Sequence, residues 1–204
     1  MPAAGPDETR QSAGGKNHNN ILTKSEGSDN RFILLKSSKK CGSIVKRMKK
    51  YMEEAIRQAA LAAQSGEVPV GCVIEKDGEI IARAHNLTET MNDPTAHAEI
   101  LAIRQAAKHQ GWQRLTGCNM YVTLEPCAMC AGAIVWARIE KVYIGAMDPK
   151  AGACGSVMNI AQNEKLNHRA EIESGIMEEE CSEMLRRFFA QRRKKNLGKT
   201  EDNK

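Results

Sequence analysis

The sequence predicts an α/β fold, a three-layer α/β/α domain built on a central mixed five-stranded sheet. Two β-rich segments joined by a tight turn are followed by segments in which strand and helix periodicity alternate. Such alternation is typical of parallel strands with helices on both faces of the sheet, and the hairpin adds an antiparallel pair. Aromatic residues make up only 4% of the chain. The core is therefore expected to consist of aliphatic side chains and Met, which suits helices packed on a small sheet.

The first half of the domain is predicted to hold a helix and a hairpin. Apolar residues recur at helical spacing between 48 and 63, and Gly66 ends this helix. The segments 68–74 and 79–82 are rich in Val and Ile, and an Asp-Gly pair stands between them. That pair is typical of a two-residue hairpin turn, so both segments are predicted to be strands.

The second half is predicted to alternate helices with strands. Apolar residues recur at helical spacing over 96–109, and a β-rich segment at 120–124 precedes a helix over 126–137. Pro126 is expected at the first position of that helix. The remaining elements are a strand at 141–144, a weaker strand at 169–172 and a helix from about Met177.

Charge is unevenly distributed along the 204 residues. The formal net charge of +5 combines +7 over 1–50, −8 over 51–185 and +6 over 186–204. An acidic body between basic ends places any attraction for phosphate at the ends, and the last helix is the better candidate.

The ends of the chain lack the periodicity of the body. Half of the positions from 11 to 30 are Gly, Ser or Asn. We therefore expect a disordered basic leader at 1–47, a folded domain at 48–195 and a disordered tail at 196–204. The leader is either an arm that contacts RNA or, as we favour, an unstructured segment.

Composition also bears on location and cofactors. No apolar run approaches the ~18 residues of a membrane span, and the first residues lack the features of a secretory signal. Seven cysteines, an odd number, indicate a reducing compartment. We therefore expect a cytoplasmic protein without a membrane partner. No Gly-rich phosphate loop follows a strand, so no organic cofactor is expected.

Four residues with metal-binding or acid–base chemistry lie where two predicted helices begin. Cys127 and Cys130 lie ~60° apart around a helix, close enough to bind one metal ion. His97 and Glu99 lie ~200° apart, so they can share a site only near a helix N-terminus. Thr95 is a suitable N-cap residue and predicts such an N-terminus.

One imidazole and two thiolates predict a catalytic zinc site. They neutralise Zn²⁺ and leave its fourth position open for water, whereas structural zinc has four protein ligands. Glu99 then stands beside the metal as an acid–base group. The cysteines alone also fit a redox pair or two buried thiols, and Cys72, Cys118 or Cys154 could complete a structural zinc site. The conjunction of the two motifs favours catalytic zinc.

Pro94-Thr-Ala-His-Ala-Glu99 and Glu125-Pro-Cys-Ala-Met-Cys130 resemble the signature of zinc-dependent nucleobase deaminases. From about Met48 to Lys195 the chain resembles the bacterial tRNA-specific adenosine deaminases of the cytidine/deoxycytidylate deaminase superfamily. Further matching segments are Gly66-Glu-Val-Pro-Val-Gly71, Tyr121-Val-Thr-Leu124, Gly145-Ala-Met-Asp-Pro-Lys150 and Asn167-His-Arg169.

The resemblance implies a cytidine deaminase-like fold and hydrolytic conversion of the wobble adenosine of a tRNA anticodon to inosine. It implies a homodimer acting on the anticodon stem-loop, with one zinc per chain on His97, Cys127 and Cys130, and Glu99 as proton shuttle. The positions that match substrate contacts of the family are Asn86, Asp148, Phe188, Phe189, Arg192 and Arg193.

Alternatives remain for both the substrate and the contacts. A deaminase of a free base or nucleotide, such as cytosine, guanine or dCMP, would use the same zinc chemistry, but would gain nothing from the basic last helix. A non-catalytic, zinc-stabilised RNA-binding module would not need Glu99. Asn86 and Asp148 also suit plain structural roles at a strand end and a turn. Likewise, the last helix would carry an apolar stripe and a basic end in any case.

Overall fold

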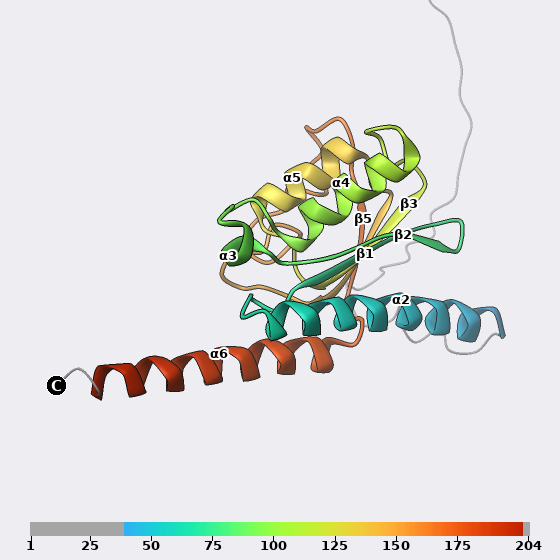
Figure 1. The fold of residues 1–204 in the computed structure, drawn as a ribbon. Coiled ribbons are helices and arrows are strands. Elements are labelled where there is room, and N and C mark those ends of the chain that lie inside the picture. Colours follow the sequence, from blue (N-terminus) through green and yellow to red (C-terminus); the bar gives the residue numbers. More distant parts are fainter. Residues whose placement is uncertain (1–38, 202–204) are drawn as a thin grey trace, which may run out of the picture. The chain divides into compact units, whose positions relative to one another are not determined.

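The computed structural model describes the backbone of residues 39–201 and the side chains of residues 42–194. Helices cover both faces of one sheet (Figure 1). Helices α2 (Lys39–Gln64) and α6 (Glu178–Glu201) pack on one face, and α4 (Ala98–Gln110) and α5 (Ala128–Ala137) lie on the other. The predicted three-layer α/β/α architecture is confirmed.

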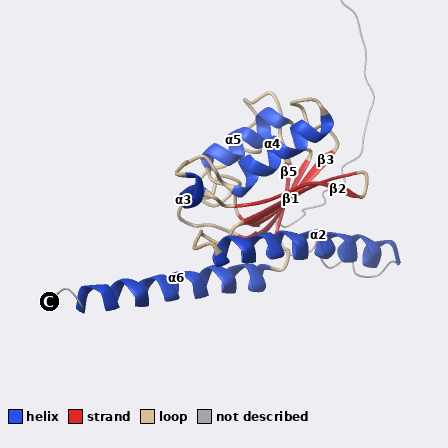
Figure 2. Ribbon diagram, in the orientation of Figure 1, coloured by secondary structure: helices blue, strands red, loops and turns tan. Residues whose placement is uncertain are grey.

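The strands, red in Figure 2, form one sheet. The sheet has five strands in the order β2-β1-β3-β4-β5. β1 pairs antiparallel with both β2 and β3, whereas β3, β4 and β5 are parallel, so the sheet is mixed as predicted. The residues of the hairpin turn, Asp77 and Gly78, both have positive φ, as a tight turn requires. The strands are β1 (Gly71–Lys76), β2 (Glu79–His85), β3 (Cys118–Leu124), β4 (Lys141–Ala146) and β5 (Glu171–Ser174).

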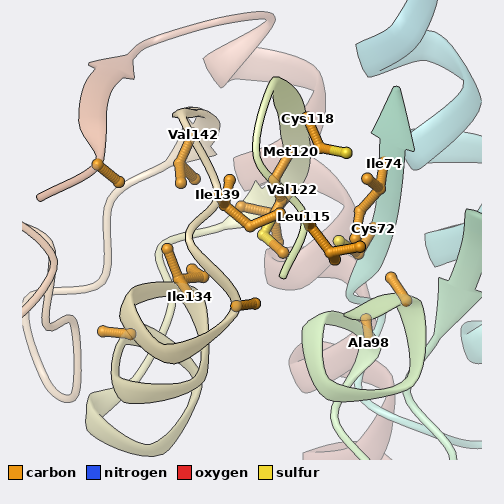
Figure 3. Close-up of a cluster of buried hydrophobic side chains, with 14 of the residues drawn as sticks. Cys72, Ile74, Ala98, Leu115, Cys118, Met120, Val122, Ile134, Ile139 and Val142 are labelled. Atoms are coloured by element: carbon orange, nitrogen blue, oxygen red, sulfur yellow. The ribbon is translucent and has the colours of Figure 1, made fainter. Parts of the chain in front are cut away.

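Alternate strand residues face the two helical layers. On β1, Cys72 and Ile74 join the cluster that packs against α4 and α5 (Figure 3), and Val73 joins the cluster beneath α2 and α6. At Gly71 the sheet approaches α2 so closely that a Cβ atom would lie 2.0 Å from the Ala55 carbonyl oxygen. The strand therefore needs glycine at this point.

Two domain boundaries and one short helix differ from the prediction. α2 begins at Lys39, so residues 39–47 are helical instead of disordered, and α6 continues through 196–201. The first of these segments is rich in Lys, a good helix former, but its described side chains, at 42–47, are all exposed, so no buried apolar stripe marks the helix. A short helix, α3 (Thr88–Met91), was not predicted. The rest of the expected leader and tail, residues 1–38 and 202–204, lies outside the described residues.

No helix in the described part of the chain combines the length and apolar character needed to cross a membrane.

Candidate metal centre

Both sequence motifs place their first metal-binding residue at the N-cap of a helix. His97 is the N-cap residue of α4 and Cys127 is the N-cap residue of α5, each with extended backbone angles, and neither side chain makes a capping hydrogen bond. Both helices therefore begin two residues later than predicted. Thr95 donates from its amide and hydroxyl to Asp93 instead, and Pro126 precedes the cap. Because neither side chain makes a capping hydrogen bond, the imidazole of His97 and the thiol of Cys127 can bind a metal ion.

The three predicted ligands converge on one point. Nδ1 of His97 lies 3.8 Å from the Cys127 sulfur and 3.6 Å from the Cys130 sulfur. All three ligand atoms lie within 4.8 Å of one another. Tetrahedral zinc with its usual bond lengths requires nitrogen–sulfur separations of ~3.6 Å, so the residues fit Zn²⁺.

No fourth ligand joins this group within the part of the chain that the structure describes. Cys72, Cys118 and Cys154, which the sequence left open as ligands of a structural site, are buried free thiols outside it. Three ligands leave one coordination position for water or substrate, which is the arrangement of a catalytic site.

Glu99 lies beside the ligands without belonging to them. The residue is only 3% exposed, and its Oε2 is the one buried side-chain polar atom among the described residues that has no hydrogen-bond partner. Burial raises the pKa of this carboxyl group. A buried oxygen without a partner is costly, so its place next to the metal group indicates a partner that arrives with the reaction.

The electrostatics of the site favour an anionic sulfur at Cys127. Hydrogen bonds from Cys130 and His97 lower the pKa of Cys127 to about 3. The bond to Cys127 and burial raise the pKa of Cys130, and the bond to Cys127 also raises the pKa of His97. The N-terminal ends of α4 and α5 add positive potential that stabilises thiolates. The group is therefore suited to a cation.

The family profile of the cytidine and deoxycytidylate deaminase zinc-binding region matches residues 45–146, which include all three ligands and Glu99. The chain belongs to this family. The match confirms zinc as the predicted cofactor, and the single ligand group in the described residues fits one ion per chain.

Individual proteins of known name are also similar to this chain. A tRNA-specific adenosine deaminase of Bacillus subtilis strain 168 is 57% identical over 145 residues, which cover 71% of this chain and 90% of the relative. One of Aquifex aeolicus strain VF5 is 50% identical over 139 residues, covering 68% and 91%. A structure from a study of A-to-I editing by tRNA:A34 deaminases at the wobble position of transfer RNA is 46% identical. Its TM-score is 0.65, and the match covers 67% of this chain and 99% of that one.

In this deaminase the Asn86 side chain caps α4, although Asn86 lies outside the motif that contains His97 and Glu99. It follows β2, is buried, and its Oδ1 accepts the Ala98 amide of α4 at 2.9 Å. This bond takes the place of a side-chain cap from within the motif. It also fixes the amide plane, so the Asn86 NH₂ group is held on the side away from the Ala98 amide.

Asp148 lies in the loop that follows β4. Hydrogen bonds connect this loop to the start of α5. Its Oδ1 accepts the Lys150 amide at 2.9 Å, as in an Asx turn. Its own amide donates to Oε2 of Glu125 at 2.9 Å. The turn interpretation of Asp148 is therefore correct, and it leaves Oδ2 for other contacts.

The last helix of the deaminase reaches the segment after Asn86. Arg192 of α6 pairs with Glu89 of α3 at 3.2 Å and stacks over the Phe188 ring at 5.8 Å. Phe188 and Phe189 meet edge to face at 5.4 Å. Phe189 and Arg193 are exposed. None of these side chains belongs to the metal group, and Arg192 instead contacts α3.

Two buried carboxylates within the segments that resemble the family escaped the sequence interpretation. Glu67 is 0% exposed and accepts the amides of Thr90 at 2.7 Å and Glu89 at 3.2 Å. Glu125 is 3% exposed and accepts bonds from the loop that holds Asp148. Both residues lie inside segments that matched the family, between apolar neighbours. An acidic residue in an apolar context was the available signal.

Proposed function

We propose that this chain is a zinc-dependent tRNA adenosine deaminase that converts the wobble adenosine of an anticodon to inosine. The observation that carries the proposal is Glu99, a buried carboxyl with an unpartnered oxygen beside a three-ligand zinc group. The sequence identity to relatives named tRNA-specific adenosine deaminase supports adenosine in tRNA as the substrate.

The reaction adds water to the adenine carbon that bears the amine and releases ammonia. Zinc held by His97, Cys127 and Cys130 would supply the Lewis acid that lowers the pKa of water to about 7. Glu99 accepts a proton from the water and delivers it to the neighbouring ring nitrogen. It then carries the second proton to the departing amine, so the carboxyl group returns to its initial state. The raised pKa of Glu99 suits a group that must both gain and lose a proton near neutral pH.

We expect residues outside the zinc group to contact the RNA substrate. The NH₂ group of Asn86 donates to the flipped base, and Asp148 contacts the RNA next to it. Arg192 and Arg193 attract phosphates, and the aromatic pair on α6 offers a stacking surface. The +6 charge at the end of the chain supports RNA over a small substrate, since a free base would gain nothing from it.

We also propose that the protein is a homodimer in the cytoplasm, where a reducing environment keeps thiol ligands reduced. The outer face of α4 and α5 has a groove, lined in part by Ile103, Ala133 and Leu166, with Trp136 81% exposed at it. An exposed Trp in an apolar groove is typical of a protein interface. Light scattering tests this, because Trp136→Glu should halve the mass whereas Leu61→Glu, on α2, should not. An unchanged mass for Trp136→Glu, or a monomeric wild type, would exclude this interface.

Detection of inosine in a short anticodon stem-loop tests the function. Zinc-loaded protein should convert the wobble adenosine, and parallel reactions with free guanine, cytosine and dCMP should show no turnover. Glu99→Gln should retain one zinc per chain and lose activity by at least ~10²-fold, because the proton carrier is gone. Turnover of a free base without turnover of the RNA would replace this proposal with a free-base deaminase. RNA binding without any turnover would indicate a binding module.

A further inference from the structure

Glu125 is a buried carboxylate whose bonds all come from one loop. Oε1 accepts the amides of Cys154 at 2.9 Å and Ser156 at 3.0 Å. Oε2 accepts the Asp148 amide at 2.9 Å and the Ser156 hydroxyl. The donors span 148–156, so one side chain gathers both ends of the loop.

The same loop is bonded to the start of the metal helix. The amide of Ala153 donates to the Pro126 carbonyl at 2.8 Å, and Gly152 forms a β-bridge with Cys127. Gly152 has no room for a side chain, since a Cβ atom there would lie 2.1 Å from Glu125 Oε2. The backbone of Cys127, the loop and the carboxylate thus form one packed unit.

We infer that Glu125 is a positioning residue that fixes the 147–158 loop against the start of α5, and so sets the places of both Cys127 and Asp148. The part that concerns substrate rests on the proposed function. The part that concerns Cys127 does not, because that residue belongs to the zinc group whatever the substrate.

A carboxylate is the only side chain that can make these four bonds. Each ionised oxygen accepts two hydrogen bonds, and all four partners are donors. In Glu125→Gln the NH₂ group would face either the Asp148 amide or the amides of Cys154 and Ser156, which cannot accept, so one end of the loop would lose its anchor while the shape of the side chain stays the same. Ser156→Ala removes the hydroxyl alone and provides a milder variant at an exposed position.

Glu75 provides a matched control. It is a buried carboxylate, 5% exposed, and accepts the Gly78 amide at 2.6 Å and the Asn119 side chain at 2.9 Å. Asn119 is the second residue of β3, whereas Glu125 follows the last residue of that strand. Glu75→Gln therefore perturbs a buried carboxylate at the opposite end of the sheet.

The experiment compares Glu125→Gln, Ser156→Ala and Glu75→Gln in the full zinc-loaded chain. We expect hydrogen exchange over 148–156 to accelerate roughly tenfold or more in Glu125→Gln and less in Ser156→Ala. We expect zinc affinity, measured by competition with a chelator, to fall about 10- to 100-fold in Glu125→Gln. Glu75→Gln should leave both quantities at wild-type values. Unchanged loop exchange in both loop variants, or equal effects in Glu75→Gln, would overturn the inference.

Kinetics on the anticodon stem-loop separate positioning from general stability. Glu125→Gln should lower kcat/KM by more than tenfold while its thermal midpoint stays near that of Glu75→Gln. Equal kcat/KM in these two variants would limit Glu125 to a structural role. If wild-type protein fails to act on the RNA, the proposed function fails, yet the exchange and zinc-affinity measurements still decide the inference. If Glu125→Gln does not fold, Ser156→Ala carries the same test.

Discussion

Replacing Glu67 by Gln should destabilise the protein strongly at neutral pH. The carboxylate is fully buried and accepts three bonds from the start of α3, at Thr90, Glu89 and the Thr88 hydroxyl. Gln has nearly the same volume, so packing is preserved. Only one of the two terminal atoms of Gln accepts hydrogen bonds. The NH₂ group therefore faces either the Thr90 amide, or the Glu89 amide and the Thr88 hydroxyl.

The magnitude follows from these bonds. A hydrogen bond to a charged group contributes about 1.5–3 kcal/mol, and a buried donor left unpaired adds a desolvation cost. The free energy of unfolding of Glu67→Gln at pH 7 should therefore fall by about 2–4 kcal/mol. With a urea m-value of about 2 kcal/mol per molar, the midpoint should move down by about 1–2 M.

The pH dependence provides a second check on Glu67. Burial raises its pKa, but the bonds from Thr90, Glu89 and Thr88 outweigh burial and hold the pKa below the usual 4.5. A depressed carboxyl pKa stabilises the folded state above the unfolded pKa, and this stabilisation is lost as the pH falls through the folded pKa. The difference between wild type and Glu67→Gln should therefore shrink below pH 4.5.

Urea titrations of both proteins from pH 3 to 8 measure these differences. Glu183→Gln is the control, because Glu183 accepts Arg187 on the exposed face of α6. Solvent screens an exposed ion pair, so the control should change little. Equal unfolding free energies for wild type and Glu67→Gln at pH 7, or a difference that grows below pH 4.5, would refute the reasoning.

Further predictions concern the metal, the core and the basic ends. Removal of zinc by a chelator should abolish inosine formation, and added Zn²⁺ but not Mg²⁺ should restore it, because thiolates disfavour Mg²⁺. Gly71→Ala should lower the unfolding free energy by about 3 kcal/mol in urea titration, since its Cβ would overlap the Ala55 carbonyl. An effect below ~1 kcal/mol would contradict that close approach. Arg193→Ala should weaken binding of the stem-loop and reduce its salt dependence by about 0.7 in log–log slope; an unchanged slope would place Arg193 away from phosphate. Deletion of residues 1–38 should leave turnover nearly intact, and a large loss of RNA affinity would instead assign the leader a binding role.

The sequence predicted the metal group because its information is local. Cys127 and Cys130 share one helical turn, and His97 and Glu99 fit together only at a helix start, which is where the structure places them. The cap was wrong because Asn86, from a different element, supplies the acceptor that Thr95 was expected to provide. Spacing within one motif carries no information on that contact.

The two buried carboxylates show the limit more clearly. The bonds of Glu67 come from residues 21–23 positions later, and those of Glu125 from 23–31 positions later. Such pairings depend on how loops fold back over the sheet, which neither periodicity nor propensity describes. α3 escaped for a related reason, since a helix of four residues is too short to display a helical period.

The pairing of β1 with β3 gives the metal a role in assembly. Cys127 lies three positions after Leu124, the last residue of β3. β3 pairs residue by residue with β1, from Cys72 opposite Val122 to Lys76 opposite Cys118. A slip of one residue in this pairing would shift the chain by ~3.3 Å and exchange its two faces. Zinc ligands tolerate displacements of only about 0.2 Å. A slip of one residue would therefore move Cys127 away from His97 by much more than zinc tolerates, so we expect zinc retention to distinguish molecules with the correct strand register.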